Sequence, residues 1–139
     1  MPARANPPPI QAFLRHTRIS SPHTHQKKAA LYINSDASGN IIRSKFSGNL
    51  NGAMEIKGSA EISGSTFSGN SALNGGAIIF DGGTKTLTIA DSEFSGNTFG
   101  SAGYAASIFV RGKLELANVS FDESAQAMYF SGSSGAEVT

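Results

Sequence analysis

Two short motifs alternate along the chain, and each of them occurs four times. The first places a phenylalanine five residues after an isoleucine or leucine, in IIRSKFSGN, ISGSTFSGN, IADSEFSGN and LANVSFDES. These copies begin at Ile41, Ile62, Ile89 and Leu116, which are 21, 27 and 27 residues apart. The second motif falls between them, in AMEIKG (53–58), AIIFDG (77–82), SIFVRG (107–112) and AMYFSG (127–132). A repeat of this length has no core of its own, so successive repeats must stack on one another.

The repeats contain short segments in which apolar and polar residues alternate, and these segments are separated by Gly, Ser and Asn. Such a pattern is typical of strands, and no segment of the repeats has a helical stripe. The 16 glycines and the 15% of charged residues also favour turns and short strands over amphipathic helices. The sequence therefore predicts an all-β fold, a parallel, right-handed β-helix solenoid of about four to five coils. We expect residues 31–132 to form the β-helix and 133–139 a C-terminal tail.

Equivalent residues of successive coils should lie above one another, about 4.8 Å apart. We expect an inward stack of Phe46, Phe67, Phe94 and Phe121, and a second column of Ile41, Ile62, Ile89 and Leu116. Asn49, Asn70 and Asn97 should form a ladder of amide hydrogen bonds at a turn, where Asn also tolerates a left-handed backbone. A ligand-binding role for FSGN is the alternative. The corner after the other strand is marked by Gly58, Gly82, Gly112 and Gly132, for the same conformational reason.

The pairing of FSGN with GGAI, at Phe67–Asn70 and Gly75–Ile78, resembles the repeat pair of the polymorphic outer-membrane proteins. These are adhesin-like autotransporter passengers of intracellular bacteria. The resemblance covers about residues 31–132, and only the Phe67 copy has both halves intact. It implies a β-helix, an adhesin-like function and a cell-surface or extracellular location. Comparable repeats occur in other β-helix proteins, including polysaccharide lyases and hydrolases, so a carbohydrate-active protein is the alternative that it implies.

Residues 1–30 are a basic, Pro-rich extension with five Arg or Lys, three His and no acidic residue. Ile10, Phe13 and Leu14 have helical spacing, so we expect an irregular or partly helical cap over 10–18 that covers the first coil near Leu31. The same composition fits a disordered arm or an organelle-targeting segment of an assembly subunit. Net charge is +1, which indicates no nucleic-acid partner, and no apolar run is long enough to span a bilayer.

The sequence predicts no catalytic residue, no metal and no cofactor. Cysteine is absent, and all three histidines precede the repeats, where no acidic residue accompanies them. The outward columns of the predicted strands do not place two acids on neighbouring coils, as a general acid and base pair would need. These columns are Lys57, Asp81, Arg111 and Ser131; Glu61, Thr88 and Glu115; and Lys45, Thr66, Glu93 and Ser120. We therefore expect a non-catalytic interaction module, adhesin-like or an assembly subunit, that binds another macromolecule.

Strand alternation also predicts an apolar stripe on the outside of the solenoid. If Glu55 is to reach water, Met54 and Ile56 must point inward. The equivalent outward residues of the next coils are then Ile79, Phe109 and Tyr129, which should become more aromatic toward the C-terminal end. We expect this stripe to bind a protein partner or a second copy of the chain. Two alternatives are that residues 1–30 cover the stripe and that a one-residue slip inverts the face.

Overall fold

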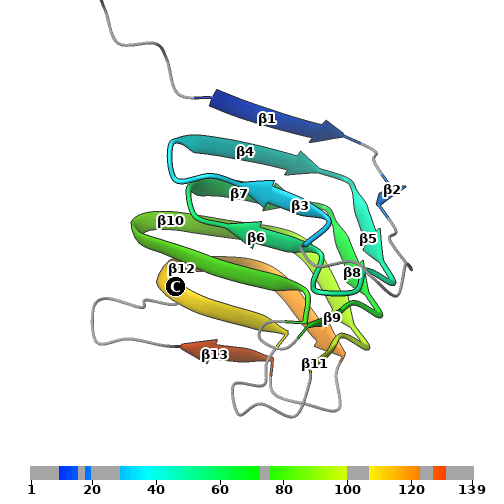
Figure 1. Ribbon diagram of the computed structural model, residues 1–139. Coiled ribbons are helices and arrows are strands. Elements are labelled where there is room, and N and C mark those ends of the chain that lie inside the picture. Colours follow the sequence, from blue (N-terminus) through cyan, green and yellow to red (C-terminus); the bar gives the residue numbers. More distant parts are fainter. Residues whose placement is uncertain are drawn as a thin grey trace, which may run out of the picture.

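The computed structural model describes residues 29–72, 76–99, 107–122 and 127–130, together with the backbone of 10–15 and 18–19. Every element among these residues is a strand, and every pair of strands is parallel. The chain makes about three full turns of a solenoid, with partial coils at both ends (Figure 1). The predicted all-β, parallel β-helix is therefore confirmed.

Each full coil contributes strands to three faces. The front face contains β3 (Leu31–Ile33), β6 (Met54–Ile56), the first parts of β10 (Ile78–Ser95) and β12 (Ile108–Asp122), and β13 (Met128–Phe130). The back face contains β4 (Ala37–Ile42), β7 (Ser59–Ser63) and the middle of β10 and β12. The side face contains β5 (Lys45–Ser47), β8 (Thr66–Ser68) and the ends of β10 and β12. Figure 1 shows β3 and β6 in front of β4 and β7.

The register of the strands follows the alignment of the repeats. Phe46, Phe67, Phe94 and Phe121 pair in sequence along the side face. Their rings stack face to face, with centroids 5.0, 4.7 and 5.0 Å apart. The column of Ile41, Ile62, Ile89 and Leu116 lies in register on the back face. The two columns fill one continuous core, and only their last members, Phe121 and Leu116, are partly exposed.

Two small strands, β9 (Ser71–Ala72) and β11 (Thr98–Phe99), pair with each other after the FSGN corner. At this corner the left-handed residue is the glycine of FSGN, because Gly48, Gly69 and Gly96 have φ of 65°, 62° and 59°. The asparagine of FSGN, which also tolerates this conformation, does not adopt it. Glycine adopts it without the steric cost of a Cβ atom, which leaves the asparagine free to hydrogen-bond.

The corner between the back and side faces has one left-handed residue in each coil. These residues are Arg43, Gly64, Asp91 and Asn118, with φ of 47°, 58°, 49° and 53°. Only one of the four is a glycine, so three coils accept a strained backbone here.

Gly112 of the second motif has a φ of 152°, which favours glycine as expected, but Gly58 and Gly82 have a different role. Gly58 and Gly82 do not have a left-handed φ. A Cβ atom at Gly58 would collide with the carbonyl oxygen of Ala37, and one at Gly82 would meet the ring of Phe80. The predicted conformational reason is therefore wrong for these two positions, where close packing excludes a side chain. Gly132 lies outside the described residues.

The N-terminal segment extends the solenoid. β1 (Ile10–Arg15) pairs with β4, and β2 (Arg18–Ile19) pairs with β5. The predicted helix over 10–18 is therefore wrong for the described residues. The free edges of β4 and β5 offer a full set of backbone hydrogen bonds, and this pairing overrides a weak local periodicity. The remainder of 1–28 lies outside the described residues, and so do all three histidines.

Candidate functional site

The outward residues of the front face form one column, in the register that the sequence predicts. Met54 and Ile56 are fully buried, and Glu55 between them is partly exposed. Ile78 and Phe80 flank Ile79 in the same way, so no one-residue slip has occurred. The strand pairing places five outward residues above one another: Tyr32, Glu55, Ile79, Phe109 and Tyr129. We call this set the front column.

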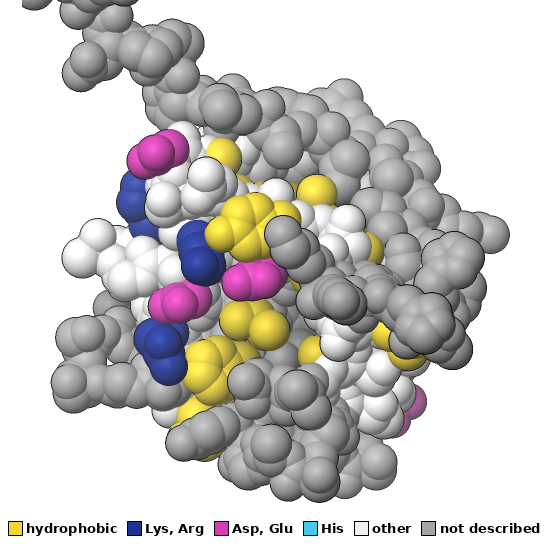
Figure 2. All heavy atoms as spheres, in the orientation of Figure 1, with side chains coloured by type: hydrophobic (Ala, Val, Ile, Leu, Met, Phe, Trp, Pro, Cys, Tyr) yellow, Lys and Arg dark blue, Asp and Glu magenta, His cyan; other side chains and the backbone are white. Residues whose placement is uncertain are grey.

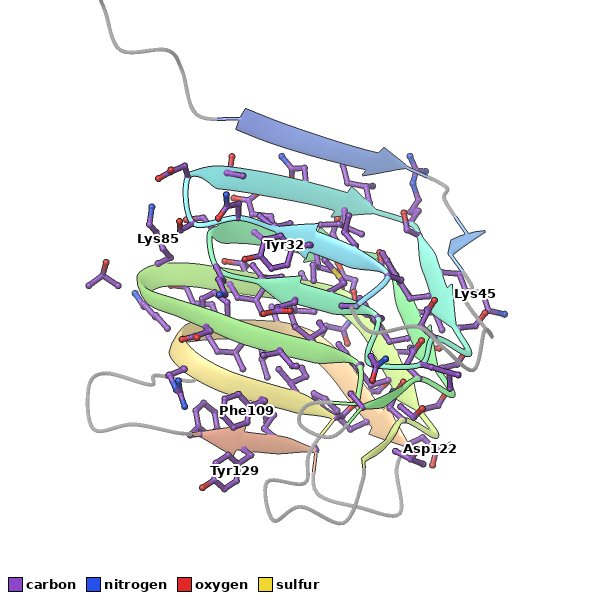
Figure 3. All side chains as sticks on the ribbon, viewed as in Figure 1. Tyr32, Lys45, Lys85, Phe109, Asp122 and Tyr129 are labelled. Atoms are coloured by element: carbon purple, nitrogen blue, oxygen red, sulfur yellow. The ribbon has the colours of Figure 1, made fainter. Side chains whose placement is uncertain are left out.

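Exposure varies strongly along the front column. Tyr32 is the most exposed member at 48%, whereas Phe109 is only 7% exposed. Ile79 and Tyr129 are half-buried. The rings of Phe109 and Tyr129 stack with centroids 5.6 Å apart and planes inclined by 16° (Figure 3). The expectation that Phe109 is an accessible anchor is thus wrong, because this ring is packed rather than exposed.

Tyr32 was missed by the sequence reasoning. It lies in LYI (31–33), one coil before the first recognised copy of the second motif. The alternation of LYI matches that of MEI, with Ile33 buried and Tyr32 exposed, and this was the available signal. The front column therefore has aromatic residues at both ends, and the predicted increase of aromatic character toward the C-terminal end is wrong.

A charged column runs beside the front column and consists of Lys57, Asp81 and Arg111. Nη1 of Arg111 lies 3.9 Å from Oδ2 of Asp81, between side chains that are both well exposed. Nζ of Lys57 lies 6.0 Å from the ring centroid of Tyr32, and Cζ of Arg111 lies 5.6 Å from that of Phe109. A cation at this distance is attracted to the face of an aromatic ring. Figure 2 shows both columns side by side on one face. Ser131 lies outside the described residues.

The predicted outward columns of the other faces also lie in register. On the back face Thr88 separates Glu61 from Glu115, and its Oγ1 lies 3.5 Å from Oε2 of Glu115. Glu115 also forms an ion pair of 3.2 Å with Lys113. The side face aligns Lys45, Thr66, Glu93 and Ser120. The two carboxylates of the back face therefore lie two coils apart, as the repeat alignment predicts.

The phenylalanine and asparagine side chains of the FSGN segments are buried and have a structural role. Asn49 Nδ2 donates to Oδ1 of Asn70, and Asn70 Nδ2 donates to Oδ1 of Asn97, over 2.8 and 2.9 Å. All three asparagines are buried, and so are the phenylalanines Phe46, Phe67 and Phe94 that precede them. These side chains are therefore inaccessible to a ligand. A ligand-binding role for FSGN, the alternative interpretation, could not use its phenylalanine or its asparagine.

A second buried ladder was missed, although its signal is present in the repeats. Ser44, Ser65 and Ser92 stand two residues before the phenylalanine in three of the four copies. Ser65 Oγ accepts from the backbone nitrogen of Ser44, and Ser92 Oγ from that of Ser65, over 3.1 Å in both cases. Each of the three hydroxyls also donates to a backbone carbonyl two residues earlier. The serine ladder stabilises the corner between the back and side faces, next to the left-handed residues. It ends at the fourth copy, where Val119 replaces serine.

Within the described ranges, no group of three or more His, Asp or Glu side chains is arranged to hold a metal ion. The same part of the chain has no helix that is long and apolar enough to cross a membrane. Comparison with protein-family models, with curated proteins and with solved structures finds no match to this chain.

Proposed function

We propose that the chain is a non-catalytic β-helix interaction module, adhesin-like or an assembly subunit, that binds a protein partner through the front face. The observation that carries this proposal is the position of Tyr32, which is 48% exposed on a paired strand with Lys57 beside its ring. An exposed aromatic ring next to a cation is typical of a residue that anchors a protein partner.

The front face combines apolar contact with charge. Tyr32 and the half-buried Ile79 provide apolar surface, and Lys57 and Arg111 lie in the adjacent column. Arg111 is already engaged by Asp81, whereas Lys57 has no ion pair in the described part of the chain. A complementary partner surface would therefore bring an apolar group onto Tyr32 and a carboxylate toward Lys57.

The acidic residues of the described columns support a non-catalytic role over the carbohydrate-active alternative. No column places two acids on neighbouring coils, as the close carboxylate pair of a retaining glycosidase would require. Glu115 is engaged by Lys113 and lies near the hydroxyl of Thr88, so it is held in a polar network on the surface. These features favour a column of solvated surface side chains over a catalytic carboxylate pair.

Site-specific photo-crosslinking in the source cells tests the proposal. A photo-reactive residue at position 32 should give a discrete adduct with a protein, whereas the same residue at position 93, on the side face, should not. Lys57→Glu should reduce the adduct at position 32 by reversing the charge beside it, and Lys45→Glu should leave it unchanged. An adduct with a second copy of the chain would identify self-association. Equal labelling from positions 32 and 93 in folded protein would contradict the proposal.

A further inference from the structure

A polar trough lies on the back face, away from the front column. It has a volume of about 270 Å³ and spans β4, β7 and the middle of β10. Six polar residues line it: Ser38, Asn40, Ser59, Glu61, Thr86 and Thr88. The trough is thus built by three successive coils, and no single repeat contains it.

Strand geometry explains why this part of the back face is hollowed. Ser38, Ser59 and Thr86 form one outward column, and Asn40, Glu61 and Thr88 form the next, two residues further along each strand. Neighbouring coils lie about 4.8 Å apart, and neighbouring columns about 6.6 Å apart. The first column has small hydroxyl side chains, so the space beside the larger Asn40 and Glu61 remains open.

Five of the six polar side chains of the trough are unengaged within the described part of the chain, and Thr88, near Glu115, is the exception. Within the described part of the chain, no hydrogen bond or ion pair engages the side chains of Ser38, Asn40, Ser59, Glu61 or Thr86. Glu115, two coils from Glu61, is by contrast held by Lys113. Glu61 is exposed and is the only charged group among the described residues that line the trough. The trough therefore presents one free carboxylate among neutral donors and acceptors.

This arrangement excludes several ligand classes. An anion would be repelled by Glu61, and an apolar ligand would find no large apolar side chain in the lining. A peptide could not add as a strand, because β4, β7 and this part of β10 are paired on both sides. A divalent cation would need more than one carboxylate, and no cluster of three acidic or histidine ligands exists among the described residues.

We propose that this trough binds an amino sugar. The ammonium group would bind the carboxylate of Glu61, which forms strong charge-assisted hydrogen bonds. The ring hydroxyls, which both donate and accept, match the hydroxyls of Ser59 and Thr86 and the amide of Asn40. Since the trough lies on another face than Tyr32, this site is independent of the proposed protein-binding surface. The same chemistry is offered by a free amino sugar and by amino-sugar units of a polymer.

Titration of the full chain with glucosamine and with a deacetylated chitotriose tests this site, with calorimetry and NMR shifts as readouts. We expect saturable binding, and roughly tenfold weaker binding of N-acetylglucosamine and glucose, which lack the ammonium group. Binding of glucosamine itself indicates a site for one sugar unit, and binding of the trimer alone indicates recognition within a polymer. Absence of saturable binding of both would overturn the proposal.

Matched variants locate the site. Glu61→Gln should remove the preference for the amine, whereas Glu93→Gln, at an exposed carboxylate on the side face, should leave it intact. Thr86→Val should weaken the binding of all the sugars, because it removes a hydroxyl from the trough while nearly preserving the shape of the side chain. Circular dichroism checks that each variant is folded. Equal affinities of the Glu61→Gln and Glu93→Gln proteins would show that binding occurs elsewhere and would refute the assignment.

Discussion

The side-chain amide of Asn70 donates a hydrogen bond of 2.9 Å to Oδ1 of Asn97, one coil further along the solenoid. The same Oδ1 accepts from the backbone nitrogen of Asn70 over 3.0 Å. The amide of Asn97 in turn donates to the carbonyl oxygen of Phe67 over 3.0 Å. Asn70 and Asn97 thus each bind the backbone of the coil before them, so that the corner is held by side-chain to backbone hydrogen bonds as well as by strand pairing.

Asn70→Ala should lower the free energy of unfolding by about 2 to 4 kcal/mol, because it leaves the backbone nitrogen of Asn49 and Oδ1 of Asn97 with fewer buried partners. Urea denaturation measures the change. Asn40→Ala is the matched control, since this half-buried side chain forms no hydrogen bond within the described part of the chain, and it should change stability by less than about 0.5 kcal/mol. Similar losses in both variants would contradict a structural role for the ladder.

Phe67→Ala should lower the free energy of unfolding by about 3 to 5 kcal/mol, because rings on both sides pack against Phe67 and cannot close the cavity that the substitution leaves. Phe121→Ala should cost about half as much, since this ring is only half-buried and stacks on Phe94 alone among the described residues. Denaturant unfolding measures both losses, and the midpoints can be compared if the unfolding free energy of each variant has the same dependence on denaturant concentration. A midpoint of Phe67→Ala equal to that of the unmodified protein would disprove the stacked core.

Gly58→Ala should be far more harmful than Gly69→Ala. The added Cβ atom at Gly58 meets the backbone carbonyl oxygens of Ala37 and Asn34, so the corner must open, at a cost of about 3 kcal/mol or more. At Gly69 the space is free and φ is 62°, so only the backbone strain of about 1 kcal/mol applies. Thermal unfolding of the two variants measures which of them loses more stability. A larger loss in Gly69→Ala would show that backbone conformation, rather than lack of space for a side chain, is the reason for glycine at position 58.

Arg43→Gly should leave stability unchanged or raise it by up to about 1 kcal/mol, because glycine relieves the strain of a φ of 47°. Gly64 already occupies the equivalent corner of the next coil with φ of 58°. Arg43→Val should destabilise by more than about 1 kcal/mol, since a β-branched residue is a poor fit to this conformation. Lys45→Gly, in the adjacent strand, should lower stability by about 0.5 to 1 kcal/mol. A loss of stability in Arg43→Gly as large as in Lys45→Gly would contradict the strain argument.

The sequence by itself determined the fold and the register. A repeat that cannot bury its own core must stack, and stacking places equivalent residues in one column at every coil. The phenylalanine, isoleucine and asparagine columns and the outward ladders all follow from this single constraint. The side of the strand on which each residue lies follows from the period of two.

Only the tertiary structure decided exposure, edges and cavities. Phe109 and Tyr32 occupy equivalent outward positions, yet one ring is packed and the other is exposed, because exposure depends on what lies beside each coil. Residues 10–15 became a strand because β4 offered an unpaired edge, which local periodicity does not reveal. The trough around Glu61 depends on the relative sizes of side chains from three coils. Repetition fixes which residues are neighbours, whereas their differing shapes decide what space remains between them.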